Sequence, residues 1–245
     1  MGRLDDRIAI VTGGNVGLGA AYSRVLAAEG ATVIVADIAD APSESPASLV
    51  VQADISEENE VAGIIDTVID QFGKIDIVVN NAAVYSTLDS VDVTDIDVDL
   101  WDRVMAVNVR GSFLMAKHAA IHMKARKYGK VINIASGVAY KGMPRLVHYA
   151  TSKSAILGLT RSLARELGQW NICVNTLAPG LILSDSITAN EEHIAEFRES
   201  VLAGRSIKRD GYPDDLIGAL IFLASAESDF MSGQTIAVDG GSINT

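Results

Sequence analysis

The chain has little cysteine, few aromatic residues and no long hydrophobic runs. Cys173 is the only cysteine, which excludes an internal disulfide and a Cys-x-x-Cys metal site. Aromatic residues make up 5% of the chain against 21 glycines, a mix that favours an Ala/Val/Ile/Gly-rich α/β core. No apolar run reaches the roughly 18 residues that a membrane helix needs, and a strand pattern that already begins at Ile8 leaves no room for a signal peptide. We therefore expect a cytoplasmic protein without a membrane partner.

Basic residues are also scarce. The chain carries 20 Lys and Arg against 31 Asp and Glu, so its net charge is −11 at pH 7. Such a balance disfavours nucleic acid or an anionic membrane surface as the partner. Charged residues at 21% and hydrophobic residues at 49% are ordinary for a globular protein. Because composition is even along the chain, we expect one domain over residues 1–245.

Short β-rich runs alternate with helical patterns throughout. The runs predict seven strands, at residues 8–11, 32–36, 49–51, 75–79, 131–134, 172–176 and 234–238. Helices are predicted at residues 17–29, 57–72, 100–125, 148–167 and 214–225. Apolar strands separated by helices imply right-handed crossovers and strands buried on both faces. The expected fold is an α/β, doubly wound, seven-stranded parallel sheet with helices on both faces.

Two segments depart from this alternation. Pro42 and Pro46 disfavour a long helix between the second and third strands. The stretch 89–102 holds six aspartates, three of them spaced like the start of a calcium loop. Leu100 and Ala106 stand where such a loop needs Gly and Glu, so a solvated acidic loop that caps the next helix is favoured. His118, His122, His148 and His193 have no zinc-binding spacing either, and no metal is predicted.

A glycine-rich turn, Thr12 to Gly19, links the first strand to the first helix. Gly13, Gly17 and Gly19 permit the turn and a close approach of the backbone to a pyrophosphate, which the helix N-terminus attracts. Asp37 ends the second strand, where a carboxylate can accept both ribose hydroxyls of adenosine and repel a 2′-phosphate. Without the glycine-rich turn before it, an Asp at the end of a strand would be interpreted as a turn or cap residue. With that turn, its position predicts NAD rather than NADP as the cofactor.

Tyr149 and Lys153 are spaced i, i+4, on one face of a predicted helix. A phenol has an ordinary pKa near 10, and an ammonium about 4 Å away contributes up to roughly 4 kcal/mol at an effective dielectric of 20. We expect Lys153 to lower the pKa of Tyr149 enough for acid/base work. Ser136 and the pair Asn80-Asn81 follow two other strands, at the edge where open parallel sheets bind ligands.

These elements together resemble the short-chain dehydrogenase/reductase family, in its branch of about 250 residues, over essentially the whole length. The resemblance is carried by Thr12-Gly13-x-x-x-Gly17-x-Gly19, Asp37, Asp54, Asn80-Asn81-Ala82, Asn108, Ser136, Tyr149-x-x-x-Lys153, Pro179-Gly180 and Gly233-Gln234 with Asp239-Gly240-Gly241. It implies a single-domain Rossmann fold and an oxidoreductase that transfers a hydride between NAD(H) and a secondary alcohol or ketone.

The resemblance also implies residue roles. Tyr149 is the general acid/base, Ser136 holds the substrate oxygen, Lys153 binds the nicotinamide ribose, and Asn108 anchors a water that links Lys153 to solvent. The expected cofactor contacts, besides Tyr149 and Lys153, are Gly13, Asn15, Val16, Gly17, Leu18, Gly19, Asp37, Ile38, Asp54, Ile55, Asn81, Ala82, Pro179, Gly180, Ile182 and Ser184. Family members are usually tetramers or dimers built from two long helices, so we expect a homotetramer or homodimer.

Residues 181–211 are expected to form a lid over the substrate, and Ile187 is one of its apolar residues. The predicted substrate pocket consists of Tyr85, Val138, Met143, His148, Leu181 and Leu183. This apolar set favours a small hydrophobic or aromatic alcohol or carbonyl compound as the substrate.

Two other functions stay open. A 3-oxoacyl-carrier-protein reductase needs a basic rim for its acidic carrier, and Lys124, Arg126, Lys127 and Lys130 offer one, although the net charge and Asp37 speak against it. A nucleotide-sensing regulator on the same fold could dispense with the Tyr149/Lys153 pair, whose presence favours chemistry.

Overall fold

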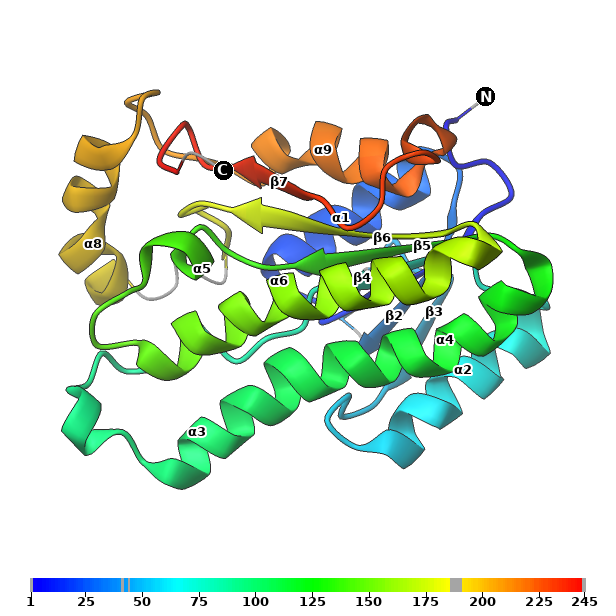
Figure 1. Ribbon diagram of the computed structural model, residues 1–245, viewed down its shortest axis with the longest axis horizontal. Helices are drawn as coiled ribbons and strands as arrows, with labels where there is room; N and C mark the ends of the chain where they lie inside the picture. Colours follow the sequence, from blue (N-terminus) through cyan, green and yellow to red (C-terminus); the bar gives the residue numbers. More distant parts are fainter. Residues whose placement is uncertain (1, 41, 44, 186–190, 244–245) are drawn as a thin grey trace.

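The seven strands form one parallel sheet in the order β3-β2-β1-β4-β5-β6-β7 (Figure 1). The computed structural model describes residues 2–40, 42–43, 45–185 and 191–243, with the backbone alone at 191–197. The strands are β1 Ile8–Thr12, β2 Thr32–Asp37, β3 Leu49–Gln52, β4 Ile77–Asn80, β5 Gly129–Ile134, β6 Ile172–Pro179 and β7 Thr235–Val238. The predicted Rossmann-like sheet is confirmed.

Helices cover both faces of the sheet. They are α1 Gly17–Ala28, α2 Glu58–Phe72, α3 Val98–Met105, α4 Ser112–Arg126, α5 Val138–Lys141, α6 Val147–Leu167, α8 Glu191–Gly204 and α9 Asp214–Ala224. Because neighbouring strand residues point to opposite faces, Ile8 and Ile10 pack under α2, α4 and α6, while Ala9 and Val11 pack under α1 and α9. Figure 1 shows these two layers below and above the sheet.

The predicted helix 100–125 is interrupted. A π-helical turn, Ala106–Gly111, joins α3 to α4 along one continuous helical path. The turn contains Asn108, whose amide group bonds to the backbone of Val84 rather than staying within the helix. A π-turn adds one residue to the helical path, which a pattern of apolar residues does not reveal.

The two irregular segments behave largely as predicted. The described residues between β2 and β3 form no helix, as Pro42 and Pro46 indicated. In the acidic stretch, Asp92 accepts a hydrogen bond from the Thr94 amide at 3.0 Å, and Asp97 accepts one from the Asp99 amide at 2.8 Å and caps α3. The aspartates therefore act as local caps.

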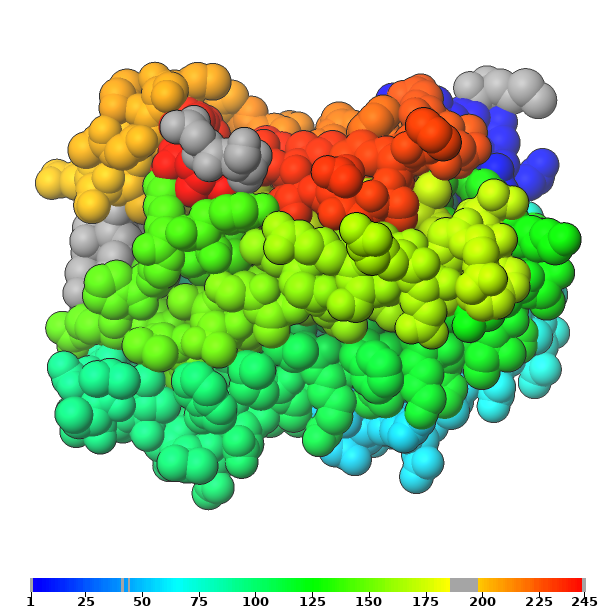
Figure 2. All heavy atoms as spheres, in the orientation of Figure 1, coloured from blue at the N-terminus to red at the C-terminus, as the bar shows by residue number. Residues whose placement is uncertain are grey.

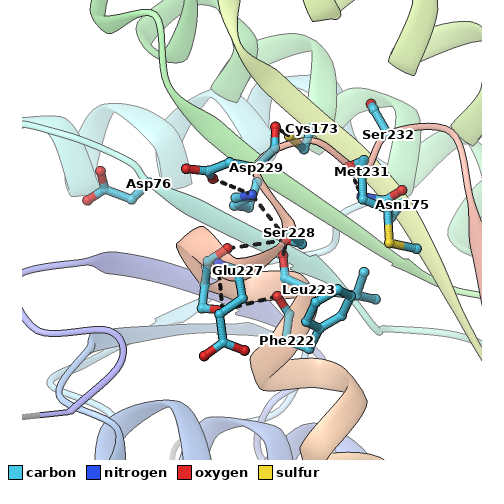
Figure 3. A network of polar contacts seen from close by, with 12 residues as sticks. Asp76, Cys173, Asn175, Phe222, Leu223, Glu227, Ser228, Asp229, Met231 and Ser232 are labelled. Atoms are coloured by element: carbon cyan, nitrogen blue, oxygen red, sulfur yellow. Dashed lines mark hydrogen bonds and ion pairs between the residues drawn. The ribbon is translucent and has the colours of Figure 1, made fainter.

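The amino ends of β5 and β6 are fastened by a polar network (Figure 3). Lys130, whose side chain is 1% exposed, donates to Ser228 Oγ at 3.1 Å and pairs with Asp229 at 2.7 Å. Cys173 Sγ donates to the Asp229 carbonyl at 3.4 Å, and Asn175 donates to the Met231 carbonyl at 2.7 Å. This network fixes the loop before β7. It lies at the end of the sheet opposite to the carboxyl ends of the strands.

Candidate active site

A cavity of about 450 Å³ lies at the carboxyl ends of the strands. Residues that end five strands or follow them within two positions line it: Gly13, Asp37, Asn81, Ser136 and Pro179. In an open parallel sheet this edge is where ligands bind, because the strand order reverses there and leaves a crevice. The cavity joins the glycine-rich turn to Tyr149 and Lys153.

The glycine-rich turn is shaped for a close backbone approach. Gly13 has a φ of +63°, and a Cβ there would lie 2.9 Å from the Cα of Ala82. At Gly19 a Cβ would lie 1.9 Å from the Gly13 carbonyl oxygen. Helix α1 begins at Gly17 without a side-chain cap, so its first amides are available to an anion. The turn fits a pyrophosphate, and no larger residue fits at these two glycines.

Asp37 is held in place by backbone amides. Its Oδ2 accepts from the Asn15 amide and its Oδ1 from the Ala39 amide, both at 3.0 Å. Each carboxylate oxygen keeps a further lone pair, so the group can still accept two ribose hydroxyls. The Asn15 side chain donates to the carbonyls of Ala39 and Asp40, and it supports this turn rather than lining the cavity.

Asp54 lies at the same end of the cavity and is paired with Arg103 at 2.9 Å. Burial of Asp54 favours the neutral acid, but hydrogen bonds from Ser56 and the contact with Arg103 prevail and hold its pKa below the ordinary value. The carboxylate is therefore charged at neutral pH. Arg103 was not predicted, because on the sequence it belongs to a helix far from the glycine-rich turn.

Ser136, Tyr149 and Lys153 come together at the other end of the cavity. Tyr149 and Lys153 lie one turn apart on α6 and are 7% and 4% exposed. The Ser136 side chain lies beside the Tyr149 phenol and lowers its pKa, and both residues line the cavity. Lys153 Nζ donates to the Ile134 carbonyl at 2.8 Å and lies 5.8 Å from the centre of the Tyr149 ring. A hydroxyl and a phenol are thus presented side by side to one ligand atom.

The protein environment shifts the two titrating groups toward their neutral forms. Burial raises the pKa of Tyr149 well above its ordinary value, the neighbouring Tyr85 adds to the rise, and only the Ser136 hydrogen bond opposes it. Burial also lowers the pKa of Lys153 from 10.5 to about 8. We expected Lys153 to lower the pKa of Tyr149, and this prediction is wrong. Desolvation of the phenol outweighs the electrostatic effect of the Lys153 ammonium, which is directed at the Ile134 carbonyl.

Asn108 is 1% exposed and does not line the cavity. Its Oδ1 accepts from the Val84 amide at 2.8 Å, and its Nδ2 donates to Ser152 Oγ at 3.0 Å. Through these bonds Asn108 ties the loop after β4, which carries Tyr85, to helix α6. The expected water between Asn108 and Lys153 stays a prediction.

The substrate side of the cavity is mainly apolar. Tyr85 packs against Tyr149 with ring centres 4.5 Å apart, and Val138, Met143, Leu181 and Val201 complete the lining. His148 does not line the cavity and is fully buried. Successive residues on a helix point in different directions, so His148 does not share the face of Tyr149. Leu183 does not line it either, since its amide bonds to the Gly211 carbonyl beside the bridge at Ile182. Ile187 lies outside the described residues.

Most predicted cofactor residues do line the cavity. They are Gly13, Val16, Leu18, Gly19, Asp37, Ile38, Asp54, Ile55, Asn81, Ala82, Pro179, Gly180, Ile182 and Ser184. Asn15 and Gly17 instead border a neighbouring recess. The cavity also includes Lys141, Asp239 and Ser242, which were not predicted as site residues. For Lys141 the sequence held one signal, a charge five residues after Ser136.

Comparison with known proteins identifies the family. The model of a family described as enoyl-(acyl carrier protein) reductase matches residues 13–242. The 2-dehydro-3-deoxy-D-gluconate 5-dehydrogenase of Escherichia coli (strain K12) is 36% identical over 250 residues, which cover 97% of this chain and 96% of that protein. This chain belongs to the short-chain dehydrogenase/reductase family.

Other members of the short-chain dehydrogenase/reductase family agree over the full length. Galactitol 2-dehydrogenase of Agrobacterium fabrum (strain C58 / ATCC 33970) is 35% identical over 254 residues, with 98% of both chains covered. The crystal structure of NAD⁺-bound xylitol dehydrogenase superposes with a TM-score of 0.88 at 27% identity and covers 97% of this chain and 99% of that one. The protein is an oxidoreductase of this family that acts on alcohol or ketone substrates.

Two further observations concern ligands and membranes. Across the residues that the structure describes, no three His, Cys, Asp or Glu side chains gather as a metal site. Within that same part of the chain, no helix combines the length and the apolar character needed to cross a bilayer.

Proposed function

We propose that this protein is an NAD-dependent dehydrogenase or ketoreductase for a secondary alcohol or ketone with a hydrophobic or aromatic body. The observation that carries the proposal is that Ser136 and Tyr149 line the same cavity as the glycine-rich turn and Asp37, with Ser136 near enough to the phenol to oppose the rise in its pKa. A single ligand-sized space thus holds both an acid/base pair and a dinucleotide cradle.

The residues present fit a dinucleotide. The turn from Gly13 to Gly19 would hold the pyrophosphate, Asp37 the adenosine ribose, and Pro179 to Ile182 the nicotinamide end. The buried Asp37 carboxylate supports NAD over NADP, because it would repel a 2′-phosphate. When bound, the nicotinamide supplies a hydride to the carbonyl carbon or accepts one from the alcohol carbon.

The protein's own residues supply the proton and the orientation. The Ser136 hydroxyl and the Tyr149 phenol would both bind the substrate oxygen, which fixes the carbon beside it. Because the raised pKa keeps Tyr149 protonated at neutral pH, the phenol is ready to donate its proton to a carbonyl oxygen. Oxidation of an alcohol needs the reverse transfer, from the hydroxyl to the tyrosinate.

The lining of the substrate side supports an apolar substrate body. Tyr85, Val138, Met143 and Leu181 offer aromatic and aliphatic surface beside Tyr149. Hydrocarbon or aryl groups fit against these side chains better than hydroxyl groups, which would lose hydrogen bonds to water there. We therefore place the substrate among ketones with a hydrocarbon or aryl group next to the reacting carbon.

The carrier-protein reductase is less well supported. Its proposed basic rim, Lys124 to Lys130, lies at the amino end of β5, away from the cavity. Lys130 is buried against Asp229, Arg126 pairs with Asp76 at 3.1 Å, and Lys124 lies 4.3 Å from the Trp170 ring centre. These cations are engaged within the chain and do not border the proposed site.

Calorimetric titration with NADH and NADPH tests the cofactor, and NADH absorbance across a panel of aryl and alkyl ketones tests the reaction. We expect NADH to bind more tightly than NADPH and at least one aryl ketone to be reduced. Asp37→Ala should narrow the preference for NADH at least about tenfold by removing the charge that repels a 2′-phosphate. Asp40→Ala, next to the same turn but outside the cavity, should leave it unchanged. Failure to bind either dinucleotide would overturn the proposal.

A further inference from the structure

Lys141 is a charged residue at the substrate end of the cavity without a carboxylate partner among the described residues. It ends the short helix α5, which begins two residues after Ser136. Its side chain lines the cavity and donates a hydrogen bond to Ser242 Oγ, a neutral group. No described carboxylate neutralises this ammonium, so it can form an ion pair with an anionic ligand in the cavity.

The other charged groups of the cavity are already engaged. Asp54 and Arg103 neutralise each other, and Asp37 accepts two backbone amides. Lys153 is directed at the Ile134 carbonyl. Asp239 accepts the amides of residues 241, 242 and 243. Of the cavity's described charges, Lys141 is thus the cation most available to a substrate.

Both partners of the Lys141 contact are fixed to the frame of the site. Helix α5 is tied to α6 because Ser154 Oγ donates to the Ala139 carbonyl at 3.1 Å. Ser242 is placed by its own amide, which donates to Asp239 Oδ1 at 3.0 Å. The backbone segments that carry Lys141 and Ser242 are therefore held in place, and the exposed Lys141 side chain reaches into the cavity from a fixed helix.

We propose that the substrate carries a carboxylate, which Lys141 binds while Ser136 and Tyr149 hold the reacting oxygen. The substrate class is then a keto acid or hydroxy acid whose body packs on Tyr85, Val138 and Met143. A lone ammonium beside one hydroxyl matches the single charge of a carboxylate better than the double charge of a phosphate. In a chain of net charge −11, a local cation is also what would draw in an anion. The inference rests on the proposed function.

The test compares acids with their amides. The probes are phenyl keto acids from 2-oxo-2-phenylacetate to 5-oxo-5-phenylpentanoate, each beside its primary amide, with NADH as reductant. For the acid of best-fitting length we expect kcat/KM to exceed that of its amide at least about tenfold, the lower end for a charged hydrogen bond. Lys141→Gln should reduce this acid-to-amide ratio about tenfold, mainly through KM, while Lys141→Arg should retain most of it.

Controls separate the outcomes. Lys127→Gln, at the lysine that follows α4 and lies outside the cavity, should keep the wild-type acid-to-amide ratio. Rising salt should lower this ratio in wild type but not in Lys141→Gln. Equal rates for acids and amides, or a ratio that Lys141→Gln leaves intact, would overturn the inference while reduction of the amides upholds the proposed function. If no phenyl ketone is reduced although NADH binds, the proposed function fails, and this inference fails with it.

Discussion

Tyr149 illustrates how burial sets the direction of a proton transfer. Tyr149 is 7% exposed and packs against Tyr85 with Ser136 beside it, and burial raises the pKa of its phenol. A protonated phenol held against a hydroxyl is arranged to donate rather than to accept. The residue's identity and spacing were predictable from the sequence, but its protonation was not, because desolvation depends on Tyr85 and the other neighbours that only the fold assembles.

Replacing Tyr149 by Phe removes the proton donor and leaves the glycine-rich turn and Asp37 intact. We expect ketone reduction to slow at least about a hundredfold, in line with the contribution of general acid catalysis, while calorimetry shows NADH binding retained. Tyr128→Phe is the matched control, because the Tyr128 hydroxyl has no hydrogen-bond partner among the described residues and lies outside the cavity. Turnover near the wild-type rate in Tyr149→Phe would exclude this role.

Lys153 gives the reaction a pH dependence of known sign. Since burial lowers its pKa to about 8, the side chain is charged below that pH and neutral above it. If the ammonium supports binding and proton supply, kcat/KM for reduction falls as the pH rises through about 8. Initial rates from pH 6 to 10 measure this, and Lys153→Met, assayed at higher enzyme concentration, should lack the fall. The same fall in Lys153→Met would assign it to another group.

At the scale of elements, strands were easier to predict than helical irregularities. Each strand is a short run rich in β-branched or aliphatic residues, and the inner strands are almost fully buried, so composition alone marks them. The ends of β4 and β6 were misplaced by two or three residues, because hydrogen bonds with neighbouring strands decide them. Helix α5 is too short for a period to be visible.

The π-helical turn at Asn108 is the clearest element that the sequence did not reveal. Its side chain satisfies both the amide and the carbonyl of Val84, so the turn is stabilised by a contact between distant segments. Family resemblance marked Asn108 as important, and the structure adds that it holds the loop of Tyr85 against α6. A single sequence does not show which distant segments contact each other, so it could not reveal this turn.

Asn108→Ala should therefore destabilise the fold as well as the site. Removing the side-chain amide of Asn108 leaves the half-buried backbone amide of Val84 without its acceptor, which costs about 1–3 kcal/mol of unfolding free energy. Urea denaturation measures the loss as a lower midpoint. The exposed Asn59→Ala on α2 serves for comparison, since no hydrogen bond of the Asn59 side chain is found among the described residues. A midpoint unchanged by Asn108→Ala would contradict the structural role given to this residue.

For the whole molecule, the broad flank over α4 and α6 is the surface to consider. These two helices lie side by side, and in Figure 2 their outer surfaces, green and yellow-green, are uncovered. Phe113 and Ile121 on α4 are 42% and 61% exposed, so each places a large apolar side chain on this flank. The resemblance predicts a homotetramer or homodimer built from these helices, and Phe113 and Ile121 would be covered in such an interface.

We predict that the protein self-associates through this flank. Sedimentation velocity should show a dimer or tetramer of the 25.9 kDa chain, and Phe113→Glu with Ile121→Glu should shift it to smaller species. The substituted carboxylates would have to be buried in the interface without a partner, which strongly disfavours association. A monomer at micromolar concentration would refute the prediction, and Val93→Glu, exposed but outside the flank, controls for added charge.

The buried position of Cys173 has a practical consequence for labelling the protein. The chain's single thiol is 7% exposed and held under the loop before β7, far from the catalytic end of the sheet. Thiol-directed dyes should leave it unmodified in the folded protein. One cysteine introduced at the exposed Ile38 or Tyr212 would then accept a single fluorophore, and the wild-type background already serves as the unlabelled blank for spectroscopy of ligand binding.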